Sequence, residues 1–210
     1  MRVLYPPSPK LKIHHTDLPS YERTGKWVVQ YKVNGTRTLV HVLPNCQVEL
    51  FTRHGGPHKL FQLTPNFKNE ILSLNLQPGL EYWLDGELLH SKTKTAQYKS
   101  RIVLFDVLFC GKYLFRVDQV SRLNLLRQIC GNPTTNEPHL GLALQVTENL
   151  WTLETWTDCF LEHYQRFIDQ PEVEGLVLRR KDSVLDNLGT RPYDASWILR
   201  CRKPSRTYNL

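Results

Sequence analysis

Several short segments carry side chains that could perform chemistry if the fold brought them together. The first is a strand-like stretch containing Gln30 and Lys32, followed by Asn34, Gly35 and Arg37. On a strand Lys32 shares a face with Gln30, because successive side chains point to opposite faces. A deprotonated lysine amine is a nucleophile, and a glycine beside it lets a ligand approach closely. The alternative interpretation is a surface lysine before a hairpin, since Asn-Gly favours hairpin turns.

Two other segments carry carboxylates. Asp85 and Glu87 are two residues apart, so they share a strand face and repel each other unless a cation lies between them. A lysine or Mg²⁺ would satisfy both acids, although a turn with two solvated acids also explains the pattern. Glu174 enters an otherwise apolar strand over residues 173–179.

The last strand-like segment alternates basic and apolar residues. Arg200 and Arg202 fall on one face, and Leu199 and Cys201 fall on the other. Adjacent guanidiniums suit an anion such as phosphate, although an exposed edge strand explains the same pattern. Phe105 lies in a nearly continuous apolar run, which predicts a central strand.

Strands and helices that would position these residues can be predicted from periodicity. Strands are expected at 27–33, 36–43, 47–53, 82–89, 102–109, 173–179 and 197–202, and helices at 66–76, 118–130 and 156–168. Strands outnumber helices and several are joined by short turns, which favours an α+β fold with antiparallel sheets. Residues 1–25 are Pro-rich and polar and are expected to form an irregular arm, and residues 26–210 one domain.

Composition narrows the protein class. The 210 residues include 27 Lys and Arg against 20 Asp and Glu, a net charge of +7 that suits a polyanionic partner. No apolar run approaches the length of a membrane span, so we expect no membrane association. The five cysteines include no Cys-x-x-Cys pair, which argues against a disulfide framework and against a cysteine zinc site. We therefore expect the protein in a reducing cytoplasm, or in the nucleus in a eukaryotic or viral setting.

The order of the segments resembles the covalent nucleotidyltransferase superfamily, which contains ATP-dependent DNA ligases, RNA ligases and mRNA capping enzymes. The resemblance covers residues 30–203 and rests on the motifs Lys-x-Asn-Gly-x-Arg, Phe-Thr-Arg-x-Gly, Asp-Gly-Glu-Leu, Phe-Asp, Glu-Gly-Leu-Val-Leu and the final basic strand. It implies a nucleotidyltransferase fold of two antiparallel sheets flanked by helices, as in the adenylation domain of ligases.

The resemblance implies a nucleotide site. Lys32 matches the lysine that becomes adenylylated, and Arg37 matches an arginine that contacts the ribose. Phe105 matches the aromatic residue that stacks on the base. Gln30 lies where ligases often place a residue that reads adenine, and Tyr31 lies between Gln30 and the nucleophile.

The resemblance also implies roles for the acids and a metal cofactor. Glu87 matches an acid that contacts the ribose, and Glu174 matches a metal-binding acid. Asp85 supports the Asp-Gly-Glu motif and is a second candidate metal ligand. The implied cofactors are ATP and Mg²⁺, or Mn²⁺ in its place.

Arginines fall where the superfamily binds phosphate. Arg200 and Arg202 match two residues, usually lysines, that contact the α-phosphate, and Arg53 matches an arginine near the substrate phosphate. Arg37, Arg200 and Arg202 would also favour the neutral, nucleophilic form of the Lys32 amine by like-charge repulsion. The implied reaction is formation of lysyl-AMP, transfer of AMP to a 5′-phosphate and sealing by a 3′-hydroxyl.

The sequence departs from the superfamily in three respects. Asn34 replaces the aspartate of Lys-x-Asp-Gly, and arginine replaces lysine at 200 and 202; arginine binds phosphate in a bidentate manner but cannot donate a proton near neutral pH. The superfamily usually continues into an oligonucleotide-binding (OB) β-barrel, for which these 210 residues leave no room. We therefore expect no C-terminal barrel here, and an OB-fold partner or further domain to supply it if it is needed.

Several functions stay open from the sequence. The spacing of the motifs favours an ATP-dependent DNA ligase acting on nicked DNA, with DNA repair or replication as the setting. Asn34 supports an RNA ligase instead, and a capping guanylyltransferase shares the same motifs. A catalytically decayed nucleic-acid-binding module would explain Asn34, but it would have no use for Lys32.

Overall fold

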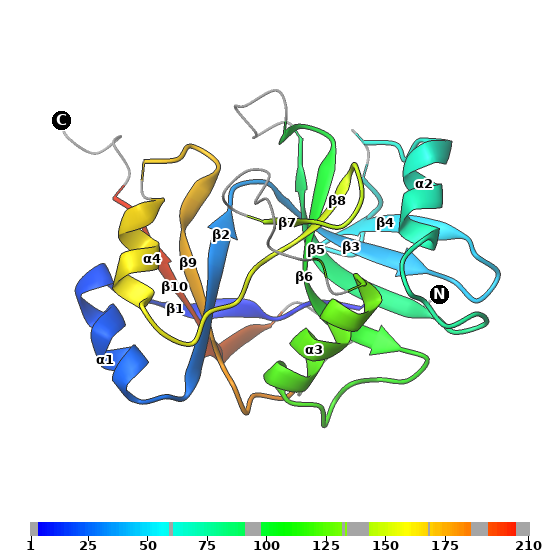
Figure 1. Cartoon of the computed structure of the whole chain (residues 1–210). Coiled ribbons are helices and arrows are strands. Elements are labelled where there is room, and N and C mark those ends of the chain that lie inside the picture. The colour runs from blue at the N-terminus through cyan, green and yellow to red at the C-terminus, as the bar shows by residue number, and fades with distance from the viewer. Residues whose placement is uncertain are drawn as a thin grey trace.

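Two mixed sheets and four α-helices make up the fold in the computed structural model, which describes residues 4–58, 61–90, 98–131, 133, 143–167, 169–185 and 193–204 (Figure 1). The helices are α1 (Leu18–Arg23), α2 (Pro65–Leu72), α3 (Gln119–Ile129) and α4 (Phe160–Arg166), with a 3₁₀ turn η1 at His15–Asp17. The strands are β1 (Ser8–Lys12), β2 (Trp27–Val33), β3 (Thr36–Val42), β4 (Val48–Thr52), β5 (Tyr82–Leu89), β6 (Arg101–Cys110), β7 (Leu144–Gln145), β8 (Leu150–Thr152), β9 (Val173–Arg180) and β10 (Asp194–Arg202).

The sheets are largely antiparallel. The four-stranded sheet has the order β1-β10-β9-β2, and the six-stranded sheet has the order β4-β3-β5-β6-β8-β7. The pairs β1–β10 and β6–β8 are parallel, so both sheets are mixed, although most of their strand pairs are antiparallel. The α+β prediction is confirmed, and every strand of the described residues belongs to one of the two sheets, with no separate barrel among them.

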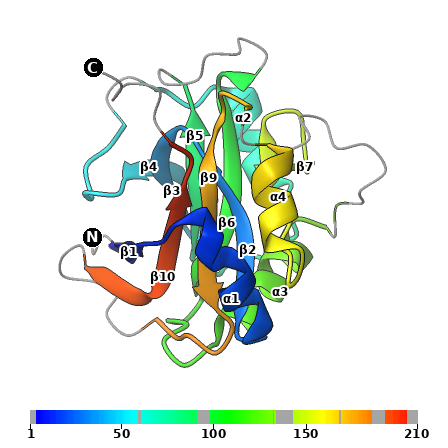
Figure 2. The ribbon, with the colours of Figure 1, turned by 90° about the vertical axis from the view of Figure 1, so that its left-hand side faces the viewer.

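Helices α1 and α4 cover one face of the four-stranded sheet; in Figure 2 α1 lies in front of the lower part of the sheet and α4 lies beside β2. Their apolar side chains pack against alternate residues of the strands, including Tyr31 of β2, Leu178 of β9 and Leu199 of β10. Because strand side chains alternate, Lys32 and Arg200 point to the opposite face of this sheet. The helices therefore bury one side of the sheet and leave the other for the functional residues.

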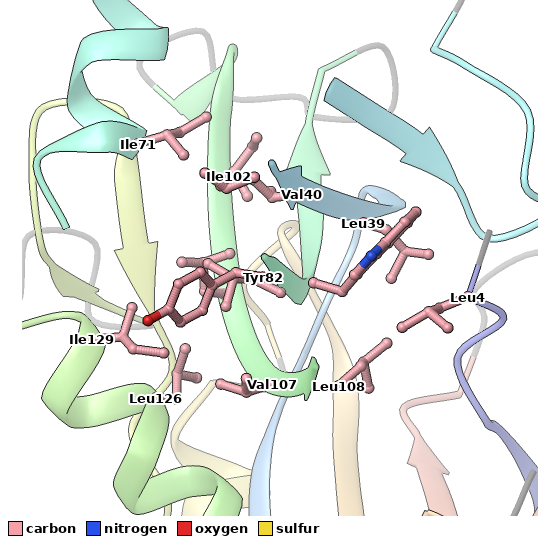
Figure 3. Close-up of a cluster of buried hydrophobic side chains, with 14 of the residues drawn as sticks. Leu4, Leu39, Val40, Ile71, Tyr82, Ile102, Val107, Leu108, Leu126 and Ile129 are labelled. Carbon is pink, nitrogen blue, oxygen red and sulfur yellow. The ribbon is translucent and has the colours of Figure 1, made fainter. Parts of the chain in front are cut away.

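The largest core packs α2 and α3 against the six-stranded sheet. Figure 3 shows Ile71 of α2 together with Leu126 and Ile129 of α3, turned toward the sheet. Leu4 enters the same core from the N-terminal segment, where it lies beside Leu108, and it is only 1% exposed. Full burial of a leucine side chain contributes about 1.5–3 kcal/mol, so Leu4 anchors the segment that follows it.

The prediction of an irregular arm at residues 1–25 is wrong for its described part. Strand β1 pairs in parallel with β10, and α1 packs on the sheet with α4. The Glu22 carboxylate accepts hydrogen bonds from the backbone N–H groups of Cys159 (2.8 Å) and Phe160 (2.9 Å) at the start of α4. Tertiary partners therefore give regular structure to a Pro-rich sequence whose local pattern does not indicate it.

Two helix ends can be compared with prediction. The helix expected at 156–168 starts at Phe160, because Trp156 instead exchanges two backbone hydrogen bonds with Val29 of β2 (2.9 and 3.0 Å). Cys159 then has φ +53°, a left-handed conformation that a helix cannot continue through. The helix expected at 118–130 is confirmed as α3, with Asp118 capping its N-terminus as predicted through a 2.9 Å bond from the Ser121 N–H.

Candidate active site

A cleft of about 440 Å³ lies between the two sheets. It collects most of the residues that the sequence singled out, from strands far apart along the chain: Lys32, Arg37, Arg53, Glu87, Phe105, Glu174, Arg200 and Arg202 all line it. The described residues contain no helix long and apolar enough to cross a membrane.

Lys32 and Glu174 form the centre of the cleft. The Lys32 Nζ lies 2.5 Å from Glu174 Oε2, and Arg202 Nη2 lies 3.2 Å from the same oxygen. The side chains of Lys32 and Glu174 are 21% and 29% exposed, so a ligand in the cleft can reach both. The closest charged partner of the lysine is thus the carboxylate of Glu174.

A local irregularity in β9 aims Glu174 at the lysine. Gly175 has φ +133°, and the register against β2 shifts at this point, since Lys32 pairs with Gly175 and Val33 with Val173. A Cβ on Gly175 would lie 2.0 Å from the Cys201 carbonyl oxygen, so the residue must be glycine. Without this irregularity, strict alternation would place Glu174 on the face covered by the helices, together with Leu176.

The Asn34-Gly35 pair does not form a hairpin, because β2 and β3 run into different sheets. Asn34 donates its backbone N–H to the Glu172 carbonyl (2.8 Å), and Gly35 donates its own to Glu87 Oε1 (3.0 Å). A Cβ on Gly35 would meet the Leu88 carbonyl oxygen at 2.5 Å. The glycine therefore permits close approach between the two sheets, directly after the lysine strand.

Arg37 is held from two sides. Its guanidinium forms a bidentate pair with the carboxylate of Asp85, through Nε (3.0 Å) and Nη2, and Nη1 donates to the carbonyl of Pro7 (2.6 Å). Asp85 is only 1% exposed and is not among the residues that line the cleft. The structure thus gives Asp85 the role of orienting Arg37, and both of its oxygens are engaged there instead of facing a metal.

Glu87 is the acid of this wall that reaches the cleft. Burial raises its pKa to about 7, and the nearby cations Lys32 and Arg37 act in the opposite direction. Near neutral pH the Glu87 carboxyl is therefore divided between its protonated and ionised forms. A group in this state can donate or accept a hydrogen bond, as a bound hydroxyl group requires.

Phe105 enters the cleft through a bulge in β6. Asp85 pairs with Asp106 and Gly86 pairs with Leu104, so Phe105 is an extra residue without a partner on β5. Bulges of this kind re-aim a side chain. The ring and Val177 of β9 both line the cleft, which gives it apolar surfaces from both sheets where a planar ring could stack.

Gln30 lies behind the cleft surface, whereas Tyr31 is among the residues that line the cleft. Gln30 is 1% exposed; its Nε2 donates to Thr155 Oγ1 (3.0 Å), and its Oε1 accepts from Arg179 Nη1. The Tyr31 ring packs in T-shaped contacts on Trp156 and Phe167, on the helix-covered side of the sheet. The Gln30 side chain is therefore occupied within the protein, whereas the buried Tyr31 hydroxyl has no hydrogen-bond partner among the described residues.

Arg179 and Pro7 are among the contributors to the cleft to which the sequence prediction gave no role. Arg179 lines the cleft and its guanidinium lies 5.1 Å from the centre of the Phe105 ring. Alternation along β9 places it on the same face as Val177, which is a signal that could have identified it. Pro7 contributes through its backbone carbonyl, for which the residue type gives no signal.

The mouth of the cleft is basic. Arg53 and Arg202 are exposed there, and Arg200 is half-buried with its Nε buried and without a hydrogen-bond partner among the described residues. A buried donor without a partner is costly unless a ligand satisfies it. The predicted phosphate residues thus present unused hydrogen-bonding capacity to the cleft.

A magnesium ion fits this cleft only in combination with a phosphate ligand. Within the described ranges no three His, Cys, Asp or Glu side chains group closely enough to hold a metal. Mg²⁺ is commonly held by one or two carboxylates together with substrate phosphates. Glu174, exposed in the cleft, meets that requirement, and Asp85 does not, because Arg37 engages it.

No family model and no curated protein matches the sequence. Solved structures do match. The ligase domain of LigD from M. tuberculosis superimposes with a TM-score of 0.61 at 18% identity, over 93% of this chain and 58% of that domain. The ATP-dependent DNA ligase of bacteriophage T7, in complex with ATP, gives 0.56 at 12% identity over 91% and 67%.

A Lig E DNA ligase described as binding DNA with a minimal scaffold gives a TM-score of 0.51 at 16% identity, over 94% of this chain and 68% of that one. The chain spans 60% and 58% of the lengths of two mycobacterial LigD structures that it matches. At these identities the match concerns the path of the backbone. The chain therefore has the nucleotidyltransferase fold found in ATP-dependent DNA ligases.

Proposed function

We propose that this chain is the nucleotidyltransferase core of an ATP-dependent polynucleotide ligase of the DNA-ligase type, with Lys32 as its nucleophile. One observation carries the proposal: the cleft places a reachable lysine amine among a carboxylate, an aromatic ring and arginines. That set provides a nucleophile, a surface for a base and a site for phosphates. The fold shared with solved DNA ligases supports the same reaction class.

In the first step the Lys32 Nζ attacks the α-phosphorus of ATP. A P–N bond forms, the α–β phosphoanhydride bond breaks, and pyrophosphate leaves. The amine must lose a proton, and Glu174 Oε2 at 2.5 Å is positioned to receive it. Arg200 and Arg202 stabilise the charge that develops on the α-phosphate. Mg²⁺ bound to the phosphate oxygens would supply further positive charge there, with Glu174 as its protein ligand before that carboxylate takes the lysine proton.

In the later steps the AMP moves to a nucleic-acid end. An oxygen of a 5′-phosphate attacks the lysyl-AMP phosphorus and breaks the P–N bond. A neighbouring 3′-hydroxyl then attacks the 5′-phosphorus, which seals the strand and releases AMP. Arg53, exposed at the mouth of the cleft, is positioned to contact the phosphate of that strand.

Covalent labelling tests the proposal. The protein is incubated with Mg²⁺ and ATP or GTP labelled at the α-phosphate, denatured, and examined for label, beside Lys32→Ala and the exposed control Lys68→Ala. We expect acid-labile label from ATP on the wild type and on Lys68→Ala, and none on Lys32→Ala. Label that persists on Lys32→Ala would refute the nucleophile, and label from GTP alone would indicate a capping-type enzyme.

Sealing assays separate the substrate classes. We expect sealing of nicked duplex DNA carrying a pre-adenylylated 5′ end, with less sealing of nicked RNA. The reverse preference would assign the chain to RNA ligation, as Asn34 suggested. A protein that neither accepts label nor seals a pre-adenylylated end would be a nucleotide- or nucleic-acid-binding module.

A further inference from the structure

We propose that residues 4–9 form a strap that crosses between the two sheets and positions Arg37, with the Pro7 carbonyl as the positioning group. The inference rests on the proposed function, because it gives a role in nucleotide binding to a segment that precedes every motif of the superfamily. The segment belongs to the Pro-rich stretch from which the sequence predicted only an irregular arm. Burial, hydrogen bonds and strand pairing along the strap support the proposal.

The strap is attached to both sheets. At its start Leu4 is 1% exposed, within the core that α2 and α3 form with the six-stranded sheet. At its end the Ser8 N–H donates to the Tyr193 carbonyl (2.9 Å), and β1 pairs with β10 of the four-stranded sheet from Ser8 onward. Figure 1 shows this part of the chain running between the two sheets. Attachment at both ends fixes the path of the residues between them.

The prolines explain how the strap can pass through the interior. Pro6 and Pro7 are buried, although neither belongs to a helix or a strand. A buried backbone N–H needs a partner, and proline has no N–H, so these two residues bring only carbonyl oxygens into the interior. The Pro7 carbonyl is satisfied there by Arg37 Nη1 at 2.6 Å. A composition that looks irregular therefore suits a buried crossing.

The Pro7 carbonyl completes the support of the Arg37 guanidinium. Asp85 holds one edge of it, through Nε (3.0 Å) and Nη2, and contacts on one edge alone would leave the group free to pivot about that edge. The Pro7 carbonyl holds the remaining nitrogen, Nη1. The guanidinium thus stays 5.7 Å from the centre of the Phe105 ring, at the surface of the cleft.

Arg37 keeps hydrogen-bonding capacity for a ligand. A guanidinium has five N–H groups, and three of those on Arg37 are engaged, which leaves one on each terminal nitrogen. The ribose and phosphate oxygens of ATP are acceptors for such groups. A guanidinium that is already fixed loses less freedom when it binds them.

The strap also forms part of the cleft itself. Residues 7–9 line it. Beyond them β1 runs beside β10, and the Ile13 N–H donates to the Arg200 carbonyl (3.0 Å). The N-terminal segment therefore connects the wall that carries Arg37 with the strand that carries Arg200.

A double-mutant cycle on ATP binding tests the positioning role. Calorimetric titrations are made on Lys32→Ala, which keeps the nucleotide from reacting. Leu4→Ala removes the anchor of the strap, Arg37→Met removes the guanidinium, and a further variant carries both changes. We expect Leu4→Ala to weaken ATP binding at least about fivefold when Arg37 is present, and to have no further effect in the Arg37→Met background.

Ile71→Ala is the matched control, because Ile71 is fully buried in the same core as Leu4 and lies away from it in Figure 3. It removes as many carbon atoms as Leu4→Ala does and should leave the affinity for ATP unchanged. Equal losses of affinity in Leu4→Ala and Ile71→Ala, or additive effects of Leu4→Ala and Arg37→Met, would overturn the positioning role. Tighter ATP binding by Leu4→Ala would also overturn it, because the Pro7 carbonyl would then compete with the ligand for Arg37.

Nuclear magnetic resonance of the arginine side chains tests the contact without a nucleotide. A guanidinium held on both sides rotates slowly about its Cζ–N bonds, so its terminal N–H groups give separate signals, which Arg37→Met identifies by their absence. We expect these signals in the wild type and in Ile71→Ala, and their broadening or loss in Leu4→Ala. Unchanged signals in Leu4→Ala would overturn the proposal whether or not ATP binds. Their loss in a protein that binds no ATP would support the positioning of Arg37 and refute the proposed function instead.

Discussion

The charge state of Glu87 links the chemistry of the cleft to the stability of the fold. In the unfolded chain its pKa returns to about 4.5, whereas burial raises it to about 7 in the folded protein. Between these values the folded state binds more protons than the unfolded state does. The contribution of Glu87 to stability is therefore complete below pH 4.5 and is lost as the pH rises through 7.

We predict that Glu87→Gln flattens the dependence of unfolding free energy on pH. Through Glu87, the wild type should lose up to about 3 kcal/mol of unfolding free energy between about pH 4.5 and about pH 8. The variant should not show this loss, because a glutamine side chain cannot ionise. Urea unfolding at about pH 5 and about pH 8 measures the effect, with the exposed Glu162→Gln as control. The same slope in wild type and Glu87→Gln would show that other groups account for it.

Arginine at positions 200 and 202 changes what the last strand can do. A guanidinium binds phosphate oxygens in fixed directions and cannot supply a proton near neutral pH. Arg202 also contacts Glu174 at 3.2 Å, so it helps to hold the acid that faces Lys32. The departure from lysine therefore preserves anion binding and adds a contact within the cleft.

At the scale of elements, the chemistry depends on irregularities in otherwise regular strands. The bulge in β6 presents Phe105, and the register shift opposite Gly175 presents Glu174. Each adds or turns a residue so that a side chain leaves its expected face. A regular sheet of the same sequence would bury Glu174 among apolar groups.

We predict that Gly175→Ala is far more damaging than Gly25→Ala. Both glycines have positive φ, but a Cβ at Gly175 would lie 2.0 Å from the Cys201 carbonyl oxygen, whereas nothing lies within 4 Å at Gly25. Gly25→Ala should cost about 1–2 kcal/mol from backbone strain alone. Gly175→Ala should cost at least about 3 kcal/mol and reduce lysine labelling, because Glu174 moves.

Denaturant unfolding and labelling of the two alanine variants provide the measurement. Similar losses of stability in both would mean that β10 moves away readily from β9. Normal labelling of Gly175→Ala would mean that the position of Glu174 does not matter for the first step.

At the scale of the whole molecule, positive charge is concentrated where a nucleic acid would enter. The chain carries a net charge of +7, and Arg53, Arg200 and Arg202 line the cleft between the sheets. Binding of a polyanion releases counterions, so affinity falls with salt in proportion to the number of phosphates contacted. Association with nicked DNA should therefore weaken steeply as salt rises.

We predict that Arg53→Ala weakens DNA binding and lowers the slope of log affinity against log salt by about one, because it removes one phosphate contact. Fluorescence anisotropy with nicked DNA at several salt concentrations measures the slope. Lys68→Ala removes an equal charge from the surface of α2 and should change neither affinity nor slope. Equal slopes for wild type and Arg53→Ala would place Arg53 away from the DNA.

Much of this architecture follows from local sequence. The alternation in Trp27–Val33 and in residues 199–202 predicts strands with one apolar face, and both strands are confirmed. Asp118 before an apolar helical pattern predicts the start of α3. Local patterns suffice here because alternation and capping involve residues close together in the chain.

Only the tertiary structure decides which functional groups meet. Asn34-Gly35 was compatible with a hairpin, but β2 and β3 join different sheets, which opens the cleft beside Lys32. Gln30 was expected to read the base, yet its amide pairs with Thr155 and with Arg179, 149 residues later in the chain. These contacts depend on pairing between distant strands and on bulges set by single glycines and extra residues. The short-range pattern of the sequence predicts neither, because both involve residues far apart in the chain.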